Sequence, residues 1–557
     1  MIVLQVVFAF VVAFFCHGAM LLSKTVGIDT EKAMLGLDAY AIQGRPAILW
    51  IRKIYDFGSL HLQYNRILTF VLLVVSAVVY LLLLRHYCDE KKTVKYAGFP
   101  FLLFWIVSPF WVAQLYFLSQ SVPVLLTLAL LPGACLLTDL GITKPKKYWW
   151  GIPAAIGIIY LSISVYQVQV TLYALAVLVV FYLKSRAKRF ANAKEAAKWI
   201  AVNVAVIMAA MLIYYVITKL FFFSGESYFS SQILWFRLGI RRGVEEVWKR
   251  AWEAAFGKNL YNYSFFPVCV LLLITSGINL FTEEIFTEDS RKGKGKRIGK
   301  GIFLLFAEFL MTLIPYAFIV FYGGGVTPRM CYPFPITEAC LLFLMTYELQ
   351  KLYNNPVLKD KKKTGIILNV IVVLAALFLL ADAAEMLRKS NRLYYTEEYV
   401  NAQDLDRAKK VKADLEAYIG ENGLDGSVYD HVIFLGKPQT EYDSVCIPDR
   451  GGATIGGSFW EWDQLFNFYR ERIYLFMEVN GYAIPKPYLS EIEEKVYYFY
   501  FEDYFGEEVE AMPAYPQDGY IRYLHDEETG LWYLAVKLGY DWNAEIEANK
   551  EIKTQGE

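Results

Sequence analysis

The chain has 557 residues, of which 56% are hydrophobic and 17% aromatic. This composition excludes an ordinary soluble protein and predicts an integral membrane protein with room for a second module. The net charge is zero, but from Asp382 onward 17 Lys and Arg residues stand against 35 Asp and Glu residues. The membrane part is therefore basic and the last segment acidic, and we expect no nucleic-acid partner.

Eleven hydrophobic runs are long enough to cross a hydrocarbon core of about 30 Å. They cover residues 2–22, 65–84, 98–115, 121–137, 150–165, 168–182, 199–222, 265–280, 301–321, 337–347 and 366–381. Alternate connections are basic, at residues 85–95, 144–147, 184–198, 291–300 and 351–363. The positive-inside rule makes these connections and the N-terminus cytoplasmic. Residues 27–50 and the acidic C-terminal segment are then outside the cell membrane.

The loop of residues 27–50 carries the carboxylates Asp29, Glu31 and Asp38 and the cation Arg45. Carboxylates beside an Arg at a membrane surface are partly dehydrated, and there such groups can do acid–base chemistry. An ordinary solvated loop has the same charge content. The stretch is the best candidate for an active-site loop, with the solvated loop as the alternative.

Two short turns carry polar groups on the predicted outer side. Tyr166 and Gln167 join two spans almost directly, which suits either a tight hairpin or a ligand contact. Residues 322–333 combine a Gly-Gly-Gly run with Arg329, and a Gly-rich backbone beside an Arg suits an anionic ligand. A plain turn is the alternative for this loop.

Residues 224–263 form the second large outer loop and contain an aromatic, basic amphipathic pattern. Its cations include Arg241 and Arg242. The pattern predicts a helix lying in the interface plane of the bilayer. These cations suit a lipid phosphate, or they anchor the helix to anionic headgroups.

The segment from Asp382 onward is long enough for one domain. We predict a helix over residues 405–419, strands over 427–435, 495–501 and 531–538, and a Gly-rich turn over 451–463. The predicted domains are a membrane domain, 1–381, and an extracytoplasmic acidic α/β domain, 382–557. Trp460 and Trp462 suit stacking on sugar faces, with a place in the hydrophobic core as the alternative.

Motifs for nucleotide, dinucleotide, zinc-protease or serine-hydrolase chemistry are absent from the sequence, and the seven cysteines show no metal-ligand spacing. We therefore expect no cofactor, and the sequence does not indicate a metal. These absences argue against nucleotide-driven pumping and redox chemistry.

The sequence resembles the serotype-converting glucosyltransferase (Gtr type II) family, polytopic enzymes of the GT-C architectural class. The resemblance rests on IDTE and GRPAILWIRK in the first outer loop, the Tyr166-Gln167 turn, Thr327-Pro328-Arg329, and SFWEWD at residues 458–463. Many members have an adjacent Asp-Asp pair where this chain has Asp29-Thr30-Glu31. The resemblance therefore does not decide which of these two carboxylates is the general base.

The resemblance implies transfer of a sugar, often glucose, from a polyprenyl-phosphate donor to a cell-envelope glycan such as O-antigen, on the outer face of the membrane. It implies Asp29, Glu31 and Asp38 as catalytic candidates. Outer cations suit the donor phosphate, and the candidates are Arg45, Arg329, Arg241 and Arg242. Substrate-binding candidates are Tyr166, Gln167, Trp460 and Trp462.

Three other functions fit parts of the sequence. A flippase or exporter of a lipid-linked glycan would also use outer cations and would not need Asp29 or Glu31. An envelope assembly scaffold would depend on the acidic tail instead of the loop carboxylates. A polymerase or ligase of O-antigen type would share the donor chemistry but would place its key cations in later outer loops.

Overall fold

The computed structural model describes residues 1–37, 40, 43–56, 60–89, 91–222, 233–285, 294–353, 362–424, 432–436, 438, 457–460, 471–484, 507–525 and 532–539. The chain forms two compact units. The first contains Met1–Leu22 and Ala39–Arg392, and the second contains Ser23–Asp38 and Leu393–Glu557. Part of the first loop thus folds with the C-terminal segment. The domain boundary between 381 and 382 stays a prediction.

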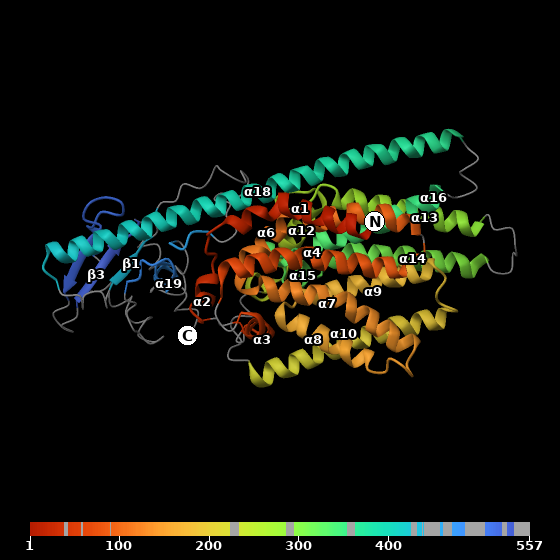
Figure 1. The fold of residues 1–557 in the computed structure, drawn as a ribbon, viewed down its shortest axis with the longest axis horizontal. Coiled ribbons are helices and arrows are strands. Elements are labelled where there is room, and N and C mark those ends of the chain that lie inside the picture. The colour runs from red at the N-terminus through yellow and green to blue at the C-terminus, as the bar shows by residue number, and fades with distance from the viewer. Residues whose placement is uncertain are drawn as a thin grey trace. The chain divides into compact units, whose positions relative to one another are not determined.

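The described residues of the first unit form helices and the turns that connect them, and its long helices α4, α7, α9 and α14 run side by side (Figure 1). Its helices are α1 (Ile2–Leu22), α3 (Pro46–Tyr55), α4 (Leu62–Tyr87), α5 (Lys91–Ile106), α6 (Pro109–Tyr116), α7 (Leu118–Thr143), α8 (Gly151–Val165), α9 (Gln169–Arg186), α10 (Ala193–Phe221), α12 (Leu234–Ala255), α13 (Phe265–Ile285), α14 (Lys294–Leu313), η2 (Ile314–Tyr316), α15 (Ala317–Phe321), η3 (Pro328–Met330), α16 (Pro333–Tyr353) and the first part of α18 (Lys362–Glu421).

Eight of the described helices are long and apolar enough to cross a membrane. The pair α5 and α6, bent by 52°, would bring the number to nine. Apart from end residues, each of the eleven predicted runs coincides with a helix or with helices joined by a short break. However, α8 has 15 residues, and α16 carries Glu338, Glu348 and Lys351. The architecture is that of a polytopic helical membrane protein, and the count of eleven spans stays a prediction.

A buried ion pair holds three of these helices together. Glu348 on α16 accepts hydrogen bonds from Arg186 on α9, Nε at 2.8 Å and Nη2 at 2.9 Å, and from Asn279 on α13 at 2.8 Å. Tyr182 donates a further hydrogen bond at 2.8 Å. Glu348 is fully buried, so these partners offset the large cost of removing its charge from water.

The second unit combines α2 (Thr30–Met34), the later part of α18 and α19 (Glu471–Val479) with a three-stranded sheet. The strands β1 (Val432–Leu435), β2 (Ile521–His525) and β3 (Trp532–Lys537) lie in the order β1-β3-β2. β1 and β3 are parallel, with Val432 opposite Leu534, while β2 and β3 are antiparallel. The helix predicted over 405–419 lies within α18, and β1 and β3 fall in predicted strands. The strand predicted over 495–501 lies outside the described residues, and the α/β class of the whole module stays a prediction.

Asp404 fixes the Gly-rich turn of the second unit to α18. Its carboxylate accepts hydrogen bonds from the Ser458 hydroxyl at 2.6 Å and from the Phe459 backbone N–H at 2.8 Å. Asp404 is almost fully buried, so these charge-assisted bonds satisfy a group that would otherwise be costly to bury.

We expect Glu348→Ala to destabilise the protein by about 3–5 kcal/mol, because it leaves the Arg186 guanidinium buried without its carboxylate. Thermal unfolding of the detergent-solubilised full chain measures this loss. The double variant Arg186→Leu with Glu348→Leu is the control, since it removes both charges, and it should regain most of the lost stability. Equal stability of the single variant and the wild type would contradict the pairing.

Candidate active site

The predicted acidic loop forms the short helix α2 in the second unit. Asp29 precedes α2 with φ 70° and ψ −13°, a left-handed conformation that Asp tolerates better than most residues. Glu31 lies in the first turn of α2, and α2 packs against α19. Local backbone geometry thus turns both carboxylates toward the helix that carries Arg472.

Arg472 bridges the two carboxylates. Its Nη1 donates to Glu31 Oε1 at 2.5 Å, and its Nη2 donates to Asp29 Oδ1 at 2.7 Å. The side chains of Arg472, Asp29 and Glu31 are 11%, 32% and 0% exposed. A planar guanidinium fixes two carboxylates at once, which an ammonium group does less well. Asp29 is therefore the carboxylate that a substrate can reach, while Glu31 holds the Arg from the buried side.

The environment of Glu31 shifts its ionisation. Burial raises the pKa of Glu31 from 4.5 to about 7, the Arg472 charge opposes this rise, and the neighbouring Asp29 charge adds to it. The effect of burial is the larger one, because removing a carboxylate from water costs more free energy than its interaction with one shared guanidinium provides.

Arg472 was not among the sequence candidates. It is separated from Glu31 by 441 positions, and nothing in its local sequence distinguishes it from the other arginines of the acidic segment. Asp38, the third predicted catalytic carboxylate, lies outside the described residues.

Trp460, one of the two aromatic residues predicted to bind sugar, lies inside the second unit. Trp460 is fully buried, packs edge-on against Phe434 with ring centroids 5.7 Å apart, and donates its indole N–H to the Asp404 carbonyl at 3.2 Å. This is the core position given as the alternative, and its ring presents no face to a sugar. Trp462 lies outside the described residues.

Two predicted phosphate-binding cations come together in the first unit, at the amino end of α7. The Arg45 guanidinium donates to Gln120 Oε1 at 3.4 Å, and the Arg329 guanidinium lies 4.1 Å from the centre of the Phe117 ring. Phe117 is the residue before α7 and Gln120 is in its first turn. The helix dipole adds positive potential at this end, so the place favours an anion.

The Tyr166-Gln167 turn lies beside Arg45. The Arg45 guanidinium is 4.6 Å from the centre of the Tyr166 ring, a cation–π contact. Tyr166 in turn stacks on buried Tyr332, with centroids 6.1 Å apart and planes at 26°. Gln167 donates to the Tyr214 hydroxyl at 2.9 Å. The structure thus brings together Arg45, Arg329, Tyr166 and Gln167, which sequence alone placed only in separate loops.

The basic amphipathic helix is present as α12, with a kink at Gly239 (φ 77°, ψ 165°). Arg241 and Arg242 lie on its exposed face, and Arg241 pairs with Glu245 at 3.3 Å with its side chain 93% exposed. A role for these two cations in binding lipid phosphate stays a prediction. Within the described part of the chain, His, Cys, Asp and Glu side chains form no group that could hold a metal ion.

A bundle of long apolar helices with a pair of guanidinium groups at a helix amino end suits a membrane enzyme that handles an anionic substrate. A family model described as Glucosyl transferase GtrII matches residues 18–347, more than half of the chain, and the protein belongs to this family. It is therefore a glycosyltransferase of the multi-pass membrane type, and the family implies a glucosyltransferase acting on cell-envelope glycans. No curated protein and no solved structure matches the chain.

The family match covers candidate residues of both units but not Arg472. Asp29, Glu31, Arg45 and Arg329 fall within residues 18–347, whereas Arg472 lies beyond them. The residue that holds the two carboxylates thus comes from the segment outside the family match.

We expect the unfolding free energy to fall as the pH rises from 4.5 to about 7, because in this window the folded protein keeps a proton on Glu31 that the unfolded chain releases. Thermal unfolding of wild type and Glu31→Gln across this pH range measures the effect. Glu31→Gln should lose part of the pH dependence. Asp406→Asn, which removes an exposed carboxyl of the same unit, should keep all of it. An unchanged slope in Glu31→Gln would refute the shifted pKa.

Proposed function

We propose that the protein transfers glucose from a polyprenyl-phosphate-linked donor to a hydroxyl of a cell-envelope glycan, on the extracytoplasmic face of the cytoplasmic membrane. The observation that carries the proposal is the Arg472 bridge, which leaves Asp29 one-third exposed beside the buried Glu31. Family membership supports the glucosyl group, and the basic connections between spans support the outer location of this loop.

Asp29 is the proposed general base. It takes the proton of the acceptor hydroxyl while the acceptor oxygen bonds to the anomeric carbon of glucose and the bond from that carbon to the phosphate oxygen breaks. Polyprenyl phosphate leaves with the bonding electrons. Arg472 orients Asp29, and buried Glu31 orients Arg472 from behind. A positioned base of this kind typically contributes about 10²–10⁴-fold to the rate.

Arg45 and Arg329 are the proposed ligands of the donor phosphate. The leaving phosphate gains negative charge as the glycosidic bond breaks, and guanidinium groups with a helix amino end stabilise such charge. A lipid-phosphate donor is already activated, so the lack of nucleotide motifs in the sequence agrees with this donor.

We expect Asp29→Asn to abolish the glucosyl branch of the envelope glycan while the lipid-linked donor persists. Glu31→Gln should lose less activity, because Arg472 keeps its bond to Asp29. Glycan analysis of cells with matched membrane levels of each variant measures both effects, with Asp406→Asn as the control. If Asp29→Asn keeps the branch, Asp29 is only a loop charge, and a flippase or a scaffold becomes the better account.

Arg45→Gln should raise KM for a synthetic prenyl-phosphate glucose donor by about tenfold or more, because the loss of a hydrogen bond to a charged group weakens binding by about this factor. Arg45→Lys should not restore it, because an ammonium lacks the planar group that lies on Tyr166. The control is Arg388→Gln, which removes an exposed cation paired with Glu385 on α18. Initial rates with purified protein in nanodiscs give these constants, and equal KM values for Arg45→Gln and the control would exclude Arg45 from the donor site.

A further inference from the structure

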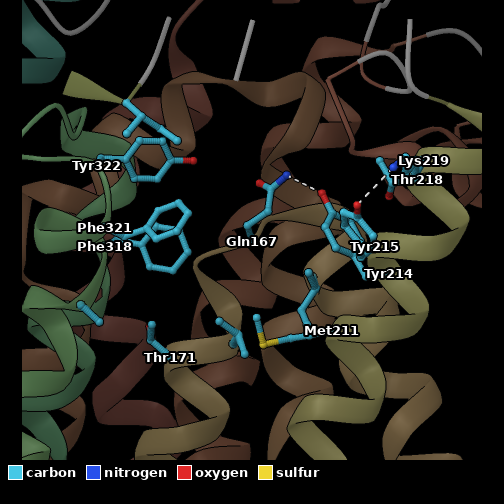
Figure 2. A pocket seen from close by; sticks show the side chains of 14 residues that line it. Gln167, Thr171, Met211, Tyr214, Tyr215, Thr218, Lys219, Phe318, Phe321 and Tyr322 are labelled. Atoms are coloured by element: carbon cyan, nitrogen blue, oxygen red, sulfur yellow. Dashed lines mark hydrogen bonds between the residues drawn. The ribbon is translucent and has the colours of Figure 1, made fainter. Parts of the chain in front are cut away.

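The first unit contains a cavity of about 640 Å³ beside the turn between α8 and α9. Its walls come from α8, α9, α10 and α15 and are mostly hydrocarbon and aromatic, including Ile163, Val170, Met211, Phe318 and Phe321 (Figure 2). Its volume lies in the range of about 300–1,000 Å³ that is usual for small-molecule sites.

Most polar groups of the cavity gather at one end. Figure 2 shows Gln167, Tyr215 and Lys219 toward this end and Thr171 and Met211 toward the other. Lys219 donates to the Tyr215 hydroxyl at 3.4 Å. The cavity therefore has one end for a polar or anionic group and a hydrocarbon interior.

Hydrogen bonds join this polar end to the Arg45 centre. Gln167 donates to the Tyr214 hydroxyl, which donates to the carbonyl of Gly44, both at 2.9 Å. Gly44 directly precedes Arg45, and Gln167 directly follows Tyr166, on whose ring the Arg45 guanidinium lies. A molecule whose anionic head is bound by Arg45 thus has the mouth of an apolar cavity next to it.

We propose that this cavity holds the isoprene units nearest the phosphate of the lipid-linked donor. The inference rests on the proposed function, because it assigns the phosphate to Arg45. Within a bilayer an apolar chain gains little by leaving lipid, so such a site selects by shape and by packing. The aromatic faces of Phe318 and Phe321 suit a methyl-branched, unsaturated chain. The enzyme then recognises both the phosphate and the tail of its donor.

The test uses purified full-length protein in nanodiscs and glucose donors with one prenyl-phosphate head and different tails. Met211→Trp fills the far end of the cavity. This substitution should raise KM for a long-chain prenyl donor by about tenfold or more, because the tail no longer fits the apolar pocket. KM for a donor with one isoprene unit should not change. The matched control is Met208→Trp, because Met208 lies on the same helix, is 61% exposed and does not line the cavity.

The outcomes separate this inference from the proposed function. If the wild type transfers glucose from prenyl donors and Met211→Trp behaves like Met208→Trp with both tails, the cavity does not hold the tail. If the wild type uses no lipid-phosphate donor of any tail length, the proposed function itself fails.

A second measurement needs no variant. A photoreactive prenyl phosphate should label wild-type peptides of α10 and α15, and excess polyprenyl phosphate should suppress the labelling while a diacyl phospholipid should not. Equal suppression by both lipids would show a general lipid site and overturn the inference.

Discussion

The Arg472 bridge is the interaction on which the proposed chemistry of the second unit depends. One guanidinium holds two carboxylates of different exposure, and this difference is the basis of the roles proposed for them. The buried Glu31 is unable to meet a substrate without movement, but it fixes the Arg. Asp29 is partly exposed, and Arg472 holds one of its oxygens. Removal of Arg472 would take away the charge that opposes the effect of burial on Glu31, so the pKa of this carboxyl would rise further.

The first unit uses the same residue type for a different purpose. Arg45 and Arg329 meet aromatic and amide side chains at the start of α7. A cation–π contact holds a guanidinium in place on an aromatic ring. In the proposed function these two cations bind the phosphate of the donor. Arg186, by contrast, is fully paired with Glu348 and stabilises the helix bundle.

In the proposed donor site the cations bind the phosphate head of the donor, and the apolar walls of the cavity near Gln167 bind its tail. Tyr214 connects the two through Gly44. Changes in the cavity and changes at Arg45 should therefore both alter donor use, while changes at Asp29 should alter the transfer step itself.

Sequence alone determined the class of this protein, because hydrophobic run length and loop charge are local properties. The runs recur as helices, and the loop motifs led to the glucosyltransferase family that the family match shows. Sequence also singled out Asp29, Glu31, Arg45 and Arg329 as charged groups in short loops. Which of these groups meet, and what holds them, depends on contacts between distant positions.

Tertiary structure decided those contacts. It placed Arg472 on Asp29 and Glu31, brought Arg45 and Arg329 to one helix end, and buried Trp460 in the core. It also divided the first loop between the two compact units. The physical reason is that an ion pair or a cavity is made by the packing of whole elements, and no spacing in the chain records a contact across 441 positions.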